Sequence, residues 1–219
     1  MRTKLFLLSI LFALFFTYFS YIVAKERWQQ IDFDVTVKLQ DHINPERSRR
    51  IDGIFSYFSL LGSVEVTVGF CLLLMFFSLI RKRFLAIIGW LMIVPASMAE
   101  VFGKLVLFHP GPPVLFHRSL LPTNLPTFYI HTNFSYPSGH MTRTIFIITV
   151  FVCMMVFTAK NSPVYRSVML CLLVLLAFLM GLTRVYLGEH WTSDVLGGGL
   201  LGVSVGLLAS VLILRLQKV

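Results

Sequence analysis

Residues 183–214 read TRVYLGEHWTSD followed by VLGGGLLGVSVGLLASVLIL, and this stretch decides the fold. Its second part, 195–214, is mostly apolar and carries no charged side chain. About 20 such residues are enough for a helix to span a membrane. Its first part places Arg184, His190 and Asp194 at the boundary of that span, where ionisable side chains are costly and indicate a functional site. We therefore expect a membrane-spanning helix with functional side chains directly before it.

The composition of the whole chain indicates an integral membrane protein. Of the 219 residues, 57% are hydrophobic and only 13% are charged, whereas a soluble domain has roughly 25% charged residues. Further apolar windows of spanning character are 5–23, 54–80, 84–108, 144–158 and 168–187. The first window has a longer apolar run than the ~7–15 residues of a signal-peptide core, so we interpret it as a retained anchor. The predicted fold class is all-α: one domain, 1–219, forming a polytopic bundle of six transmembrane helices.

The distribution of charge predicts the orientation of these spans. One set of span ends carries nine basic residues and no acid, namely Arg2, Lys4, Arg81, Lys82, Arg83, Lys160, Arg166, Arg215 and Lys218. The positive-inside rule places this face, with both termini, in the cytoplasm. All six histidines and the candidate site then face the extracytoplasmic side. The sequence pI of about 9.8 indicates attraction to anionic lipids rather than to nucleic acid, because the basic residues lie between apolar spans.

The regions outside the spans also have predicted roles. The polar segment 25–53 is expected to form one or two extracytoplasmic interfacial helices over the mouth of the bundle. The segment 109–136 is rich in proline and histidine and predicts a long outer loop. Within the last span, Gly198, Gly202 and Gly206 are four residues apart, a spacing that favours close helix–helix packing.

The motif Pro137-Ser138-Gly139-His140 precedes the fourth span, whose start we expect to reach back to Ser138. Ser138 is a good N-cap residue, and the amide groups at a helix N-terminus bind anions. Gly139 lets the backbone approach a phosphate closely, and His140 can give or take a proton. The alternative interpretation is a simple turn followed by an interfacial histidine.

The second motif combines a cation with a histidine and a carboxylate. The fork of Arg184 suits two phosphate oxygens. His190 and Asp194 are four residues apart, so a helical turn would bring them to one face. A carboxylate bonded to one imidazole nitrogen strengthens the other as a nucleophile or base. The alternative is a snorkelling arginine followed by Asp194 as a helix cap.

A third cation lies at the same end of the third span. Lys104 follows Glu100 by four residues, which is a favourable spacing for an ion pair. Either Glu100 orients Lys104 as a phosphate contact, or the pair serves only to neutralise a buried charge.

These residues resemble the type-2 phosphatidic acid phosphatase superfamily, also called lipid phosphate phosphatases, which shares its site with vanadium haloperoxidases. The family's motifs are Lys-x6-Arg-Pro, Pro-Ser-Gly-His and Ser-Arg-x5-His-x3-Asp. The second is complete at 137–140, and the third is present from 183 to 194 with threonine at its first position. In the first motif Gly111 stands where the family has arginine. We expect His109, Arg118 or Arg143 to compensate for it. The resemblance covers about residues 54–214 and implies the family's core there.

The resemblance implies a role for each motif residue. His190 attacks phosphorus to form a phosphohistidine, Asp194 orients it, and His140 protonates the leaving oxygen. The phosphoryl oxygens are held by Lys104, Arg184 and the amides near Ser138 and Gly139, with Glu100, His109, Arg118 and Arg143 as auxiliary candidates. No cofactor or metal is expected, since the sequence has no carboxylate cluster of the kind that binds Mg²⁺.

The sequence thus predicts a metal-independent membrane phosphatase that acts on a lipid phosphate or diphosphate at the extracytoplasmic face. The family's usual bacterial substrates are undecaprenyl diphosphate and phosphatidylglycerophosphate, and the sequence does not choose between them. One alternative is a lipid phosphotransferase that uses the same histidine. Another is a non-catalytic lipid-binding or transport protein on the same scaffold. The oligomeric state is not indicated.

Overall fold

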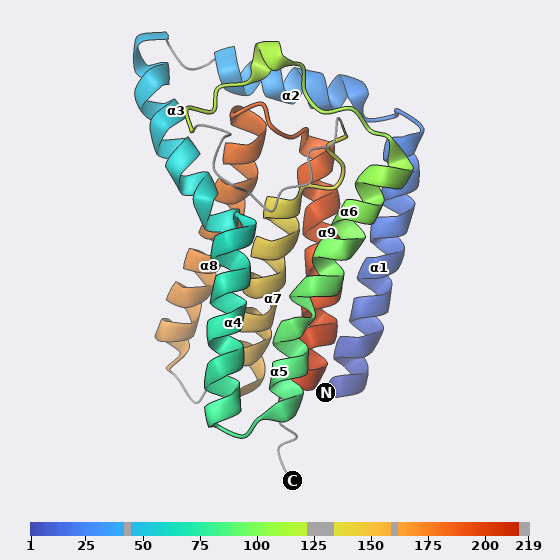
Figure 1. Ribbon diagram of the computed structural model, residues 1–219, viewed down its shortest axis with the longest axis vertical. Coiled ribbons are helices and arrows are strands. Elements are labelled where there is room, and N and C mark those ends of the chain that lie inside the picture. Colours follow the sequence, from blue (N-terminus) through green and yellow to red (C-terminus); the bar gives the residue numbers. More distant parts are fainter. Residues whose placement is uncertain (42–44, 122–133, 159–161, 215–219) are drawn as a thin grey trace.

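The computed structural model describes residues 1–41, 45–121, 134–158 and 162–214. The long helices that form the bundle are α1 (Arg2–Ala24), α4 (Val64–Ile80), α5 (Phe84–Leu91), α6 (Ile93–Leu107), α7 (Gly139–Thr158), α8 (Pro163–Tyr186) and α9 (Thr192–Ile213). At one end lie α2 (Gln29–Asp41) and the short 3₁₀ turn η2 (Val114–Phe116), while α3 (Pro45–Ser59) runs down from this end and the 3₁₀ turn η1 (Leu60–Gly62) joins it to α4. The start of α1 and the end of α9 lie at the other end (Figure 1).

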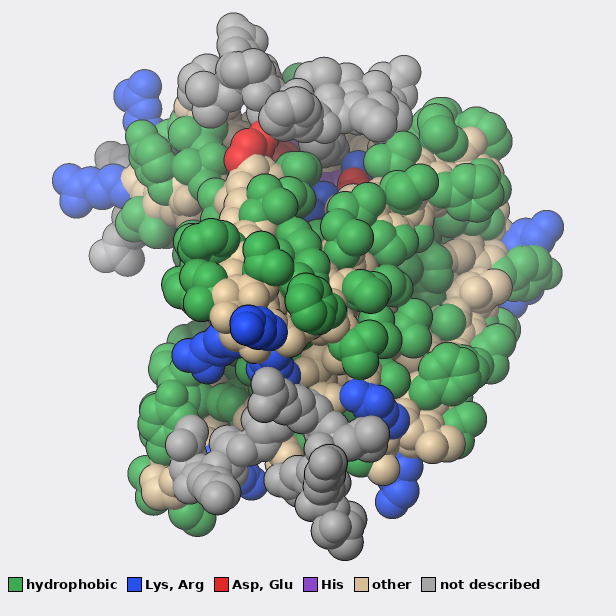
Figure 2. All heavy atoms as spheres, turned by 60° about the horizontal axis from the view of Figure 1, so that its bottom comes forward, with side chains coloured by type: hydrophobic (Ala, Val, Ile, Leu, Met, Phe, Trp, Pro, Cys, Tyr) green, Lys and Arg blue, Asp and Glu red, His purple; other side chains and the backbone are tan. Residues whose placement is uncertain are grey.

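The described part of the chain contains six helical stretches that are long and apolar enough to span a membrane. They are Arg2–Ala24, Arg49–Ile80, Phe84–Leu107, Gly139–Phe157, Pro163–Tyr186 and Thr192–Ile213. Each contains most of one predicted window, so the predicted all-α bundle of six spans is confirmed. Large apolar side chains cover its flank (Figure 2), and Leu14, Phe76, Leu105 and Phe178 are each more than half exposed. The chain is a multi-pass membrane protein.

Two of the spans are interrupted where the sequence suggested continuous helices. In the second span, η1 separates α3 from α4, and α4 restarts at Ser63, whose Oγ accepts the amide of Val66 at 3.3 Å. In the third span, α5 ends at Leu91 and α6 begins at Ile93. Pro95 explains this second break, because its ring crowds the carbonyl group four residues earlier and it has no amide to donate.

The centre of the bundle is the contact between α7 and α9, with α1 on the other side of α9 (Figure 1). A Cβ atom on Gly198 would lie 2.4 Å from the carbonyl oxygen of Ser138, and one on Gly202 would lie 2.5 Å from that of Thr142. Gly206 approaches α7 in the same way. The predicted close packing along this glycine stripe is therefore confirmed. This close packing holds the start of α9 beside the start of α7, where both motifs lie.

Helix α2 lies across the end of the bundle above the motifs (Figure 1). Its buried face is polar and consists of Asp32, Thr36 and Gln40, while Ile31 and Phe33 are about half exposed. Helix α3 differs from the expectation for 25–53, because it continues past residue 53 and its later turns belong to the second span. The helix runs without a break from the polar residues before this boundary into the apolar residues after it, so the change in polarity does not mark a helix end.

Candidate active site

Both motifs and the Glu100–Lys104 pair meet at the end of the bundle covered by α2. Helix α6 supplies Glu100 and Lys104, the start of α7 supplies residues 138–143, and the end of α8 and the turn into α9 supply residues 184–194. Most of these side chains are almost fully buried: Glu100, Lys104, Ser138, Arg143, Arg184, His190 and Asp194 are each at most 4% exposed. His140 is partly exposed. Ionisable groups buried together in this way indicate a site rather than a solvated surface.

His190 and Asp194 form the dyad that their spacing suggested. Nδ1 of His190 lies 3.3 Å from Oδ2 of Asp194, and the same oxygen accepts the amide of Trp191 at 2.9 Å. Asp194 therefore both caps α9 and orients the imidazole, so the two interpretations of this residue do not compete. With Nδ1 turned to the carboxylate, Nε2 is the nitrogen available for attack.

The surroundings of His190 keep its ring neutral. Burial lowers the pKa of His190 well below its usual range, and the positive charges of Arg184 and Lys104 lower it further. A neutral imidazole has a free lone pair on Nε2, which a nucleophile requires.

Glu100 joins two cations from different helices. Its Oε1 accepts Nζ of Lys104 at 2.8 Å, and its Oε2 accepts Nη1 of Arg143, also at 2.8 Å. Arg143 donates further to the carbonyl oxygen of Gly62 in η1 at 3.3 Å. A Cβ atom on Gly139 would lie 2.3 Å from the Glu100 carboxylate. Only glycine therefore fits at this point of the second motif, and the cluster retains a net positive charge.

Arg184 brings another positive charge to the site. Its guanidinium donates to Oγ of Ser59 at the end of α3 and to the carboxylate of Glu189. His140 interacts electrostatically with Arg184, Arg143, His190 and Lys104. The partly exposed histidine of the second motif thus lies within electrostatic range of the dyad and of the cations.

The N-terminus of α7 contributes hydrogen-bond donors. The amide of Thr142 donates to the carbonyl oxygen of Ser138 at 2.9 Å, while the amide of Ser138 itself donates to the backbone carbonyl oxygen of Asp194 at 3.0 Å. The first-turn amides of a helix have no acceptors within the helix. Oγ of Ser138 is buried, and no partner for it is found among the described residues. Ser138 directly precedes α7, at the predicted position, but among the described residues its hydroxyl makes no capping hydrogen bond.

The three candidates for the missing arginine lie in different places. Arg143 belongs to the Glu100 cluster, as described above. Arg118 donates to the hydroxyl of Tyr186 and to the carbonyl oxygen of Gln40, both at 3.4 Å, on the side of α2. Nε2 of His109 is 3.7 Å from Oδ1 of Asp194, on the carboxylate oxygen that His190 does not use. Of the three, Arg143 is the one found beside Lys104.

Asp32 is a site residue that the sequence analysis missed. Its two carboxylate oxygens accept the amide and the hydroxyl of Ser193, each at 2.7 Å. Burial raises the pKa of Asp32 to about 6. The sequence pattern that could have identified Asp32 is the recurrence of polar residues at 32, 36 and 40, which places these residues on one helical face. That face covers the start of α9 instead of facing water.

Within the described residues, no group of three or more His, Cys, Asp or Glu side chains is arranged to hold a metal ion. The groups that gather at the site are cations and helix-terminal amides, a donor set that suits a phosphate.

Comparison with known proteins gives this arrangement a family. A model of the PAP2 superfamily matches residues 84–218. The undecaprenyl-diphosphatase of Sulfolobus acidocaldarius is 29% identical over 205 residues, which are 91% of this chain and 88% of the relative. Phosphatidylglycerophosphatase B of Bacillus subtilis is 33% identical over 72 residues, which are 33% of this chain and 36% of the relative.

Two solved structures share the fold. The transmembrane PAP2-type phosphatidylglycerolphosphate phosphatase from Bacillus subtilis matches with a TM-score of 0.70 and 20% identity, over 92% of this chain and 93% of that structure. LpxE of Aquifex aeolicus matches with a TM-score of 0.54 and 22% identity, over 82% of this chain and 94% of that structure. The chain belongs to the PAP2 superfamily and is a membrane enzyme of its lipid phosphatase class.

Proposed function

We propose that this protein hydrolyses a lipid phosphate or diphosphate without a metal, through a phosphohistidine formed on His190. The observation that carries the proposal is the buried dyad of His190 and Asp194 beside three cations: Lys104, Arg143 and Arg184. These cations supply positive charge where the transferring phosphoryl group develops negative charge.

The first step of the proposed reaction forms the phosphoenzyme. Nε2 of His190 attacks phosphorus as the bond to the lipid oxygen breaks, and His140 donates a proton to that oxygen. Asp194 stabilises the positive charge that develops on the His190 ring. The bond from Nδ1 to Asp194 supports this role, because it leaves Nε2 as the attacking nitrogen.

The second step releases phosphate. Water attacks the phosphohistidine, His140 accepts its proton, and His190 returns to its neutral state. The partial exposure of His140 supports its exchange of protons with solvent in both steps. The pKa of His190 is held well below its usual range by burial, which supports the neutral ring as the resting form.

The proposed site faces the extracytoplasmic side, with both termini in the cytoplasm. The acid-free basic residues at the opposite span ends support this orientation through the positive-inside rule. His109, His117, His140 and His190 all belong to the site end, while His42, His131, Lys160, Arg215 and Lys218 lie outside the described residues. In this proposal the chain forms a single membrane domain, 1–219, in which residues 54–214 are the catalytic core. The exposed face of α2 carries the apolar Ile31 and Phe33 beside the charged Asp34 and Lys38, a mixture that suits the interfacial location proposed for 25–53.

The proposed substrates are amphiphiles with a terminal phosphate, of the undecaprenyl diphosphate or phosphatidylglycerophosphate type. Both are named in the relatives described above. The relative that aligns along nearly the whole chain is the undecaprenyl-diphosphatase, so we place the polyprenyl diphosphate first.

The test is phosphate release by purified protein in detergent with EDTA present, with each of the two lipids and phosphatidic acid as substrate. The variant His190→Ala removes the nucleophile. His117→Ala is the matched control, because His117 is an exposed histidine at the same end of the bundle. We expect release by the native protein and by His117→Ala, and loss in His190→Ala.

Release that persists in His190→Ala would contradict the mechanism. Consumption of the substrate only when a second, acceptor lipid is added, with the phosphoryl group recovered on that lipid and not as free phosphate, would instead establish the phosphotransferase, which the substitution of Gly111 for the family's arginine favours.

A further inference from the structure

His109 is a buried histidine beside the dyad that the proposed mechanism does not use. It follows α6 closely and is 7% exposed. Its Nε2 lies 3.7 Å from Oδ1 of Asp194, whereas Nδ1 of His190 lies beside Oδ2 of the same carboxylate. The fully buried carboxylate of Asp194 therefore stands between two imidazole rings.

The backbone around His109 directs it toward the start of α9. Phe108, the residue before it, has φ 50° and ψ 31°, a left-handed conformation that a bulky residue rarely adopts. Strain of this kind is often found at functional sites, where the surrounding structure maintains it. The carbonyl oxygen of His109 accepts the amide of Ser135 at 2.9 Å, and Pro110 forms an antiparallel bridge with Phe134. These contacts hold the strained turn and fix the place of His109.

The ring of His109 is oriented by its neighbours. It meets the buried ring of Tyr136 edge to face, with the ring centroids 6.2 Å apart. Its Nε2 also lies 3.5 Å from Oγ of Ser193, whose hydroxyl hydrogen is donated to Asp32. The neighbours of Nε2 are thus two acceptors, the oxygen of Ser193 and the carboxylate of Asp194. We therefore assign the hydrogen of a neutral His109 to Nε2.

This orientation argues against His109 as a contact for phosphate. The sequence suggested that it could compensate for the arginine that Gly111 replaces. With its hydrogen on Nε2 and directed at Asp194, the other nitrogen, Nδ1, has only a lone pair. A neutral His109 then has no hydrogen to donate to a phosphoryl oxygen. Its contacts lead to the carboxylate that orients the nucleophile.

We propose that His109 is a positioning residue of the phosphatase reaction, which donates from Nε2 to Oδ1 of Asp194 and so keeps Oδ2 facing His190. The separation of 3.7 Å is longer than a hydrogen bond, and catalytic contacts of this length shorten when substrate binds. A carboxylate held at both oxygens cannot turn away while positive charge develops on His190. This inference rests on the proposed function, because it concerns the same nucleophile.

The contacts of His109 also link the nucleophile to the helix that lies across the site. Asp32 in α2 accepts the hydroxyl of Ser193, and Ser193 is the second neighbour of Nε2 of His109. The series continues through Asp194 to His190. The position of α2 is thereby coupled to the orientation of the dyad.

The test measures phosphate release from undecaprenyl diphosphate in detergent, with kcat, KM and inhibition by inorganic phosphate determined separately. His109→Leu removes the donor and keeps most of the volume. His109→Gln places an amide nitrogen near the position of Nε2, while His109→Asn carries the same amide too short to reach Oδ1. His117→Leu is the matched control, because His117 is an exposed histidine of the same segment. The thermal unfolding midpoint of each variant is measured alongside.

We expect His109→Leu and His109→Asn to lower kcat about tenfold, as loss of a group that orients a catalytic side chain does. KM and the inhibition constant of phosphate should stay within about twofold of the native values, because no phosphate contact is lost. His109→Gln should bring kcat back to within about threefold of the native value. The comparison of Gln with Asn holds even where the Leu variant does not fold.

Three results would overturn the inference. A higher KM and weaker inhibition by phosphate at native kcat would make His109 a phosphate contact. Equal losses in the Gln, Asn and Leu variants would assign the effect to packing of the ring on Tyr136. Native rates in His109→Leu would leave the residue without a role while the proposed function stood. Absence of His190-dependent release from the native protein would instead overturn the proposed function, and this inference with it.

Discussion

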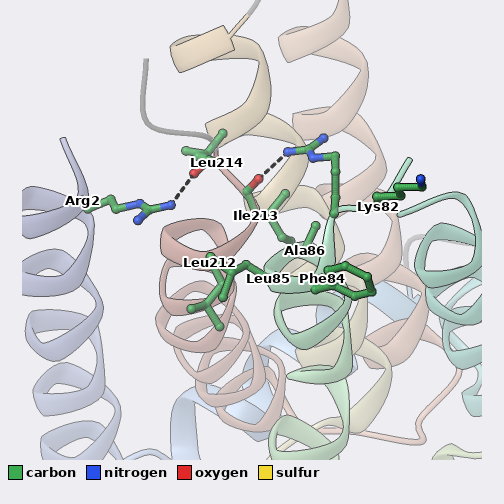
Figure 3. Close-up of a pocket in the computed structure, with 9 residues that line it drawn as sticks. Arg2, Lys82, Phe84, Leu85, Ala86, Leu212, Ile213 and Leu214 are labelled. Atoms are coloured by element: carbon green, nitrogen blue, oxygen red, sulfur yellow. Dashed lines mark hydrogen bonds between the residues drawn. The ribbon is translucent and has the colours of Figure 1, made fainter. Parts of the chain in front are cut away.

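The two ends of this bundle treat positive charge in different ways. At the end under α2, Lys104 and Arg143 bind the carboxylate of Glu100, and Arg184 binds that of Glu189. At the other end, Arg2 and Arg83 bind backbone carbonyl groups of α9 (Figure 3). Carboxylates fix the cations of the first end in place and reduce their net charge, as a preorganised site requires. The span ends at the second end carry basic residues and no Asp or Glu in the sequence, which is typical of a surface that meets anionic lipid.

The largest effect is expected from neutralising one carboxylate at the site end. In Asp194→Asn, the amide oxygen still accepts the amide of Trp191, so α9 remains capped, but the negative charge beside His190 is lost. We expect kcat to fall by about 10⁴-fold, as when the carboxylate of a catalytic triad becomes an amide. Phosphate release and the thermal unfolding midpoint are measured together. A variant that keeps its activity would show that the dyad has no role in the chemistry.

Breaking the ion pairs of Glu100 should affect folding as well as activity. Glu100→Gln removes the carboxylate that the buried Lys104 and Arg143 both bind, and breaking a buried ion pair in this way costs about 3–5 kcal/mol. SDS-induced unfolding in mixed micelles gives this difference. Glu65→Gln is the control, because Glu65 is exposed at the start of α4 and should change stability by less than about 0.5 kcal/mol. Equal effects of the two substitutions would mean that the buried cations do not depend on Glu100.

Asp32 in α2, the helix that lies across the site, should make the free energy of unfolding depend on pH. Its pKa is raised to about 6 by burial, so the native state binds more protons than the unfolded state between about pH 4 and pH 6. The free energy of unfolding therefore falls as the pH rises through this window, by up to about 3 kcal/mol. Asp32→Asn removes this dependence, while Asp34→Asn, on the exposed face of α2, keeps it. Identical pH profiles for both variants would exclude Asp32 as the source.

The fold could be predicted well because apolar runs and spacings report directly on spans and packing. The windows, the glycine stripe of α9 and the start of α7 after Ser138 all follow from local sequence. The breaks at η1 and at Met92 did not follow from hydropathy, since the residues around them are apolar on both sides. Only the effect of Pro95 on the preceding turn was open to prediction from sequence.

The site was predictable to the extent that its residues are close in sequence. The spacings of His190 with Asp194 and of Glu100 with Lys104 are four residues, and these pairs do meet. The pairing of Arg143 with Glu100 and that of Asp32 with Ser193 join residues 43 and 161 positions apart. Contacts of this kind depend on how the helices are arranged, which no local pattern encodes.

A smaller effect is expected midway between the two ends, where the glycine stripe joins α9 to α7. In Gly202→Ala the new methyl group meets the backbone of α7 at 2.5 Å, so the helices must move apart, at a cost of about 1–3 kcal/mol. Gly199→Ala is the matched control, because a Cβ atom there finds no atom within 4 Å. SDS-induced unfolding measures both.

Because α9 carries Asp194 at one end and the carbonyl groups bound by Arg2 and Arg83 at the other, a shift of this helix should also lower phosphate release. If Gly202→Ala weakened the fold but left phosphate release unchanged, the position of α9 at the site would be set by Asp32 and the turn around His190 instead of by the stripe.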